Sequence, residues 1–127
     1  GDQKVETFSV KTEKLDEIIP ADIKIDLIKI DVEGAEVIVL RGAKETLMRN
    51  KPVVLFEFSS GGGSMYNTRP EEVYDLFAAC NMQVSVIEYF LKGMQGFSRD
   101  EFCGQYHKGY NYFFIAYPDK ILHHPNT

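Results

Sequence analysis

The stretch Lys29–Glu36, which reads KIDVEGAE, brings three acidic side chains and a glycine to the end of an apolar run. The predicted strand that contains this run, Ile25–Asp31, is rich in β-branched residues, which is typical of a parallel strand buried on both faces. A helical pattern follows it over Gly34–Asn50. Ligands of open α/β sheets bind where strands end, so this stretch predicts both a fold class and a candidate site.

Strands and helices alternate along the rest of the chain. The other predicted strands are Val5–Val10, Val53–Phe58, Gln83–Glu88 and Tyr110–Tyr117. The other predicted helices are Glu13–Ile19 capped by Thr12, one from the capping box Thr68–Glu71 to about Cys80, and one from the capping box Ser98–Glu101 to about His107. Gly42 is a predicted break in Gly34–Asn50. This alternation predicts a mostly parallel sheet, and the last two strands are open to antiparallel pairing because no long helix separates them.

Composition limits the class of protein. The 127 residues amount to one domain, with 44% hydrophobic and 26% charged residues. A formal net charge of -5 argues against nucleic acid as a partner. The sequence has neither a signal-peptide pattern nor an apolar stretch long enough to cross a bilayer, so we expect a cytoplasmic protein without a membrane partner. Cys80 and Cys103 lack metal-site spacing; we expect no metal, and a buried free thiol at Cys80.

Several segments together resemble the FkbM family of S-adenosylmethionine-dependent methyltransferases. They are IKIDVEGAE at 28–36, LRGA at 40–43 and PVVLFE at 52–57, with Leu15-Asp16 upstream and Asn111-Tyr112-Phe113-Phe114 downstream. The first three segments follow one another in the family's order over about thirty residues, and the resemblance covers most of the chain, although residues 89–109 look individual.

The resemblance implies a fold and an activity. The family has the class I methyltransferase fold, a Rossmann-like seven-stranded sheet with an antiparallel final hairpin, and it methylates hydroxyl groups of sugars, polyketides or related metabolites. Ile25–Asp31 and Val53–Phe58 would be the fourth and fifth strands of that sheet. We therefore expect an α/β partial Rossmann-like fold, with a mixed sheet, an antiparallel C-terminal hairpin and flanking helices.

One part of the family pattern has no counterpart in the sequence. The glycine-rich turn that admits the cofactor and the acidic residue that binds its ribose are both missing, and Gly61-Gly62-Gly63 lacks the spaced-glycine pattern. We therefore interpret residues 1–127 as a single partial methyltransferase domain without its cofactor-binding N-terminal half. We expect this chain alone to bind S-adenosylmethionine poorly or not at all.

The carboxylates are the candidate site residues. Asp31, at the end of its strand, is predicted to contact the cofactor's cationic end or the acceptor hydroxyl, or else to cap the next helix. Glu33 either points into the crevice or complements the helix N-terminus, and Glu36 is expected to do the latter. Glu57 interrupts an apolar strand; beside Asp31 it would be a general base, the alternative being a hydrogen-bonded structural acid. Asp31 and Glu57 are thus the catalytic candidates, and Asp31 and Glu33 the cofactor-binding ones.

Three hypotheses follow. The main one is the C-terminal portion of an S-adenosylmethionine-dependent O-methyltransferase that acts on a hydroxyl of a small molecule or sugar and is inactive as this fragment. The second is a non-catalytic α/β interaction module that forms a homodimer through the exposed sheet edge at Ile25–Asp31. The third is a phosphoacceptor or metal-binding domain that uses Asp31, and it lacks a second acidic cluster and a phosphate loop.

Overall fold

Four strands form one mixed sheet. The computed structural model describes residues 4–60 and 67–119. Its strands are β1 (Leu27–Ile30), β2 (Val53–Glu57), β3 (Met82–Ser85) and β4 (Phe113–Pro118), in the spatial order β1-β2-β4-β3. β1 and β2 are parallel, whereas β4 runs antiparallel to both of its neighbours. The expected α/β arrangement with an antiparallel C-terminal strand pair is confirmed, and it is compatible with a partial Rossmann-like fold.

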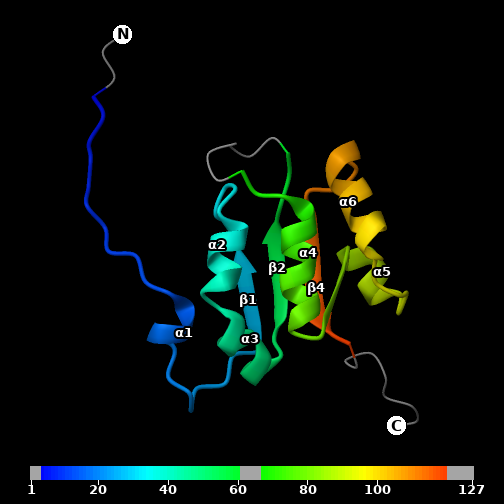
Figure 1. Ribbon diagram of the computed structural model, residues 1–127, viewed down its shortest axis with the longest axis horizontal. Coiled ribbons are helices and arrows are strands. Elements are labelled where there is room, and N and C mark those ends of the chain that lie inside the picture. The colour runs from blue at the N-terminus through cyan, green and yellow to red at the C-terminus, as the bar shows by residue number, and fades with distance from the viewer. Residues whose placement is uncertain (1–3, 61–66, 120–127) are drawn as a thin grey trace.

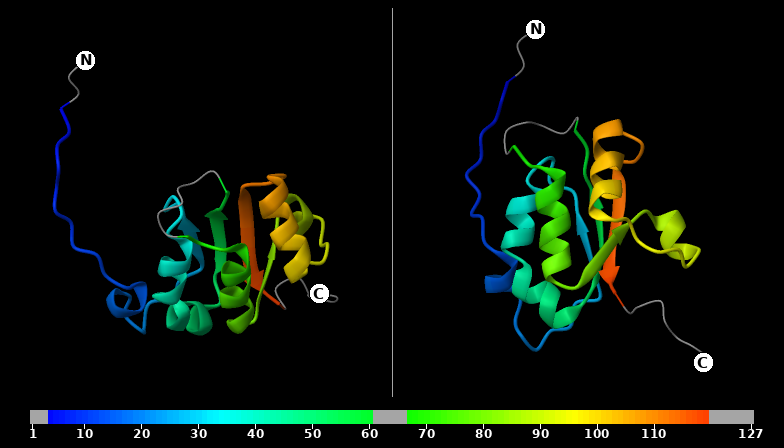
Figure 2. Two further views of the ribbon diagram at one scale, coloured as in Figure 1. Left: turned by 45° about the horizontal axis from the view of Figure 1, so that its top comes forward. Right: turned by 45° about the vertical axis from the view of Figure 1, so that its right-hand side comes forward.

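The helices connect these strands and cover the sheet. They are α1 (Leu15–Ile18), α2 (Glu36–Arg41), α3 (Lys44–Asn50), α4 (Pro70–Ala79), α5 (Ile87–Leu91) and α6 (Arg99–Lys108). α2, α3 and α4 lie over the same face of the sheet (Figures 1 and 2). Gly42 separates α2 from α3, so the predicted break is confirmed.

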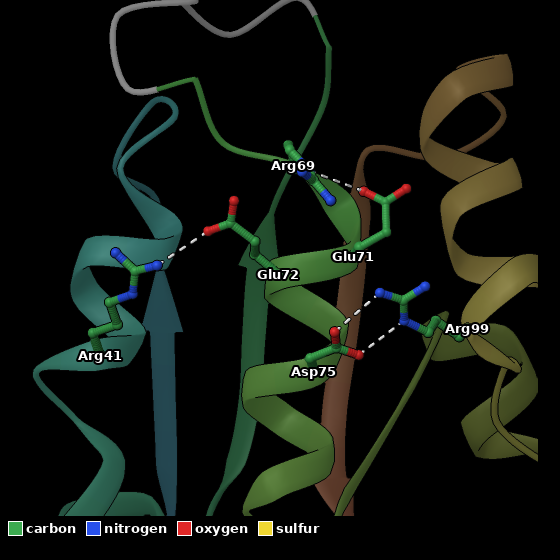
Figure 3. Close-up of polar contacts among 6 residues, drawn as sticks. All are labelled: Arg41, Arg69, Glu71, Glu72, Asp75 and Arg99. Carbon is green, nitrogen blue, oxygen red and sulfur yellow. Dashed lines mark hydrogen bonds and ion pairs between the residues drawn. The ribbon is translucent and has the colours of Figure 1, made fainter.

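Exposed ion pairs link neighbouring helices on this face (Figure 3). Arg41 of α2 reaches Glu72 of α4 at 3.2 Å, and Arg99 of α6 reaches Asp75 of α4 at 3.0 Å. Such surface pairs each stabilise a fold by less than about 1 kcal/mol, so they add little to the packing of the helices.

An aromatic cluster forms the core between the sheet and the helices. Phe56 of β2 lies opposite Phe114 of β4 in the strand register, and their ring centroids are 5.7 Å apart. Phe77 of α4 lies 5.2 Å from Phe56, and Phe102 of α6 lies 5.0 Å from Phe114. All four side chains are at most 1% exposed. The cluster therefore joins two strands and two helices that lie far apart in the sequence.

β4 is covered on its other face as well. Four successive residues, Phe114–Tyr117, are buried, and Phe90 of α5 lies 4.8 Å from the ring of Tyr117. The strand predicted over Gln83–Glu88 is correct only to Ser85. Ile87 instead begins α5, because the chain turns there to cover the sheet.

β1 is the edge strand and is covered on one face. Ile30 is 4% exposed, whereas Leu27 is 58% exposed and Lys29 also faces solvent. The prediction that Ile25–Asp31 is buried on both faces is therefore wrong for this chain, because no described element packs on the side of Leu27 and Lys29.

The predicted strand Val5–Val10 is also wrong. Within the described part of the chain these residues have no strand partner and are fully exposed, extending away from the sheet (Figure 1). The helix after them begins only at Leu15, and Thr12 does not cap it, because the N-cap residue is Lys14.

Asp16 of α1 holds the start of α3. Its carboxylate accepts hydrogen bonds from the backbone N–H of Glu45 at 3.0 Å, and from the N–H and hydroxyl of Thr46 at 2.8 and 2.7 Å. Burial raises the pKa of Asp16, but the hydrogen bonds from Thr46 and Glu45 outweigh it and hold this pKa below its ordinary value. A carboxylate in this position supplies the cap that α3 lacks locally.

The two predicted capping boxes have different outcomes. Ser98 and Glu101 form theirs at the start of α6. The box predicted from Thr68 is wrong: Arg69 is the N-cap of α4 without a side-chain bond, although Pro70 does occupy the first turn. Thr68 instead donates its hydroxyl to the Gly34 carbonyl near the end of β1, so it supports the candidate site.

Two segments of the chain lie mostly outside the residues that the structure describes. The glycine-rich loop Ser59–Asn67 falls mostly outside the described residues, as does the polar tail Asp119–Thr127. Cys80 is a buried free thiol, as predicted. None of the described helices is long and apolar enough to cross a bilayer.

Candidate active site

Asp31 and Glu57 lie side by side at the carboxyl ends of two parallel strands. Ile30 of β1 pairs with Phe56 of β2, so the next residues, Asp31 and Glu57, meet at the same end of the sheet. Asp31 does not cap α2, whose N-cap is Ala35 without a side-chain bond. The capping alternative for Asp31 is therefore wrong.

A strained turn follows β1 and brings more acids to the same place. Glu33 has a φ of 50° and Gly34 a φ of 101°. Glycine adopts positive values of φ readily, so Gly34 permits a tight turn that another residue would strain. The turn delivers Glu36 as the first residue of α2. Its Oε1 accepts a 3.2 Å hydrogen bond from the Gly34 N–H, and its side chain is buried at 3% exposure.

These acids line a small cavity, which we call the acidic hollow. Its volume is about 60 Å³, and its lining comprises Asp31, Glu33, Gly34, Glu36, Glu57, Phe58, Ser59 and Tyr112. The structure thus brings together all three predicted site residues, Asp31, Glu33 and Glu57. Within the described ranges no three His, Cys, Asp or Glu side chains are arranged to hold a metal ion.

Crowding of negative charge changes the protonation of Glu57. Its pKa lies above the ordinary 4.5, first because of repulsion from Asp31, then because of burial and the hydrogen bond that the two carboxyl groups share. Lys29 opposes this rise and Glu33 adds to it. A carboxylate with a raised pKa is a better general base near neutral pH than an ordinary one.

Two aromatic residues, Phe58 and Tyr112, are among the lining residues of the hollow. Phe58 lies directly after β2, and Tyr106 of α6 lies 4.6 Å from its ring. Burial raises the pKa of the Tyr106 hydroxyl, with the charge of Glu36 as the next cause, so Tyr106 stays a neutral phenol. Asn111, two residues before β4, donates its side-chain N–H to the Gln105 side-chain oxygen.

The sequence did not identify four contributors to the hollow. Glu36 was expected only to complement the helix dipole, and the lining roles of Phe58, Ser59 and Tyr112 were not predicted. Phe58 and Ser59 directly follow Glu57 in the sequence, so their position next to the end of β2 could have identified them as lining residues. Tyr112 reaches the hollow through the antiparallel pairing of β4 with β2, which local sequence does not encode.

A mixed α/β sheet with acids at its strand ends is compatible with the partial methyltransferase domain that the sequence predicts. Comparison with known proteins supports this class: the model of the Methyltransferase FkbM domain matches residues 1–91. The chain belongs to the FkbM methyltransferase family. The match includes the hollow's residues from β1 and β2 but ends before α6 and β4. No curated protein and no solved structure matches the chain.

Proposed function

We propose that this chain is the C-terminal portion of an S-adenosylmethionine-dependent O-methyltransferase that acts on a hydroxyl of a small molecule or sugar. The observation that carries the proposal is the contact of Asp31 with Glu57 at the strand ends, where the pKa of Glu57 is raised. A paired carboxylate of this kind suits the removal of a hydroxyl proton.

The hollow fits only part of the cofactor. At about 60 Å³ it is too small for the whole molecule, but its acidic lining suits the positively charged end. Glu33 is the residue that would hold that end, which leaves Asp31, beside Glu57, to the acceptor. When bound, the cofactor supplies an electrophilic methyl group on a positively charged sulfur, and the rest of its binding surface would come from an upstream half-domain.

The residues of the hollow then have defined roles. Glu57 would take the proton that the acceptor hydroxyl loses on methylation, so that the hydroxyl oxygen can act as the nucleophile. Asp31 keeps Glu57 basic by its charge and its shared hydrogen bond. Positioning of the two reactants supplies most of the remaining rate enhancement.

Calorimetry with S-adenosylhomocysteine tests this function. We expect no binding by the 127-residue chain and saturable binding by a form extended upstream by about one half-domain. In the extended form, Asp31→Asn and Glu57→Gln should each lower kcat by about 10²–10⁴. Glu88→Gln, on exposed α5, is the matched control and should leave kcat unchanged. Failure of the extended form to bind would contradict the proposal.

A second candidate function rests on the free edge of β1. A groove of about 810 Å³, with Leu15, Ile28 and Ile38 among its apolar lining residues, runs beside this strand. The Asp26 carbonyl accepts from the Val53 N–H, so by alternation the backbone groups of Leu27 point away from β2. Such an edge accepts a further strand.

The hypothesis of a self-associating interaction module uses this edge to form a homodimer. Lys29, exposed within β1, opposes pairing of two copies by charge repulsion. Size-exclusion chromatography with light scattering separates the candidates: the module requires a dimer of the 127-residue chain, strengthened by Lys29→Thr. If the 127-residue chain and its Lys29→Thr variant are both monomers, the interaction-module hypothesis fails. The edge of β1 is then left to pair with an upstream half-domain.

A further inference from the structure

One oxygen of the hollow has no partner. Glu36 is 3% exposed, and its Oε1 accepts from the Gly34 N–H. Its Oε2 is buried and receives no hydrogen bond from any residue in 4–60 or 67–119. A buried carboxylate oxygen without a donor is costly, so such groups are expected to meet a hydrogen-bond donor in the functional state.

The charge of the hollow indicates what kind of donor this is. Four carboxylates line it, those of Asp31, Glu33, Glu36 and Glu57, and its described lining has no basic side chain. The positive charge that lowers the pKa of Glu57 is that of Lys29, which lies outside that lining. A ligand that carries phosphate, sulfate or carboxylate would be repelled, whereas a cation would be attracted.

The side chains of the hollow favour an ammonium group over a metal ion. The described residues offer no set of three His, Cys, Asp or Glu side chains that could hold a metal ion. Phe58 and Tyr112 line the hollow, and aromatic rings attract ammonium groups. An ammonium group also carries three N–H donors, enough for several of these oxygens.

We propose that the acidic hollow is a recognition subsite for a primary ammonium group, bound by Glu36 Oε2 and Asp31 beside the lining residues Phe58 and Tyr112. The assignment of this ammonium to the methyl acceptor, which makes the acceptor an amino sugar or amino alcohol, rests on the proposed function. Binding of the ammonium to the hollow does not, because all of its contacts come from this chain.

Titration of the 127-residue chain with glucosamine, followed by amide NMR, tests the proposal. The Gly34 amide reports directly, since it donates to Glu36. We expect saturable shifts at Gly34 with a Kd on the order of 1 mM. Glucose, which lacks the ammonium, should produce none. Glu36→Gln and Asp31→Asn should each weaken binding at least about tenfold, and the control Glu88→Gln should bind normally.

Each remaining outcome decides against the proposal in a different way. Equal responses to glucose and glucosamine, or normal binding by Asp31→Asn, would overturn the ammonium subsite; Asp31 is exposed, so this variant tests the site even where Glu36→Gln does not fold. Saturable shifts with MgCl₂ that exclude glucosamine would make it a metal site. Displacement of glucosamine by S-adenosylhomocysteine would assign the ammonium to the cofactor.

The proposed function fails separately from this inference. It is lost when the upstream-extended form does not bind S-adenosylhomocysteine, whatever glucosamine does to the shorter chain. Binding of glucosamine without methyl transfer by the extended form would leave an ammonium site and remove the acceptor assignment. Binding of S-adenosylhomocysteine by that form without any glucosamine response would leave the enzyme and remove the ammonium subsite.

Discussion

β4 and β1 belong to the same sheet and have similarly apolar sequences, FFIAYP and LIKI, yet their environments differ. β4 lies between two strands and is buried on both faces, whereas β1 has one neighbour and leaves Leu27 58% exposed. The apolar side chains of β4 are buried within this chain, whereas β1 leaves the apolar side chain of Leu27 exposed. The comparison shows that a strand's sequence reports the burial it is suited to and not the burial it receives.

The largest expected effect breaks the packing of β4. Phe114→Ala removes a ring in contact with Phe56 and Phe102, at 0% exposure, and should lower the free energy of unfolding by about 4 kcal/mol. Leu27→Ala, the matched change in β1, should cost no more than about 0.5 kcal/mol. Urea unfolding monitored by circular dichroism measures both, and similar losses would refute the contrast between the strands.

The next largest effect concerns the hydrogen bonds of Asp16 to the start of α3, on the β1 side of the molecule. Asp16→Ala leaves the buried Thr46 hydroxyl and two α3 amides without their acceptor, so it should cost about 2 kcal/mol. The pKa of Asp16 is lowered in the fold. Its contribution is therefore present above pH 3.8 and lost as the pH falls through the lowered value. Chemical unfolding across that range should show the loss in the wild type and not in Asp16→Ala.

Glu57→Gln should give a smaller effect of opposite sign. Because the folded-state pKa of Glu57 is raised above 4.5, the folded state loses stability as the pH rises through that raised value. The variant lacks this loss, so it should melt at a higher temperature than the wild type near neutral pH, and the difference should vanish below pH 4.5. Thermal melts at both pH values check this; a destabilised variant at neutral pH would show that Glu57 is a structural acid.

The smallest effect is expected at the helix surface. Asp75→Asn breaks the ion pair with Arg99, whose side chains are about half exposed, and should cost less than about 1 kcal/mol. Salt should diminish the difference, because the pair faces solvent (Figure 3). If the difference in unfolding free energy between the wild type and Asp75→Asn persists in molar salt, the ion pair contributes to fixing the position of α6.

The sequence predicted those parts of the site that follow from strand topology. Carboxyl ends of neighbouring parallel strands meet at one edge, so an acid at the end of each, Asp31 and Glu57, could be placed together in advance. The turn at Gly34 and the break at Gly42 were also predictable, because both rest on local backbone chemistry.

Features that depend on distant partners were not predictable. Thr68 has the sequence of an N-cap but bonds to Gly34 across the fold, and α3 is capped by Asp16 rather than by a preceding residue. Val5–Val10 has a strand's composition, but composition does not supply a neighbour. The burial of Glu36 likewise depends on how the turn after β1 packs, which no local pattern encodes.

The position of β4 also constrains how the chain is made. The last strand that the structure describes is an interior strand of the sheet, and β2 and β3 pair with it rather than with each other. During synthesis, residues 53–57 and 82–85 therefore lack their shared neighbour until residues 113–118 have left the ribosome. The described sheet is incomplete until then, and the unpaired sides of β2 and β3 stay open to wrong partners.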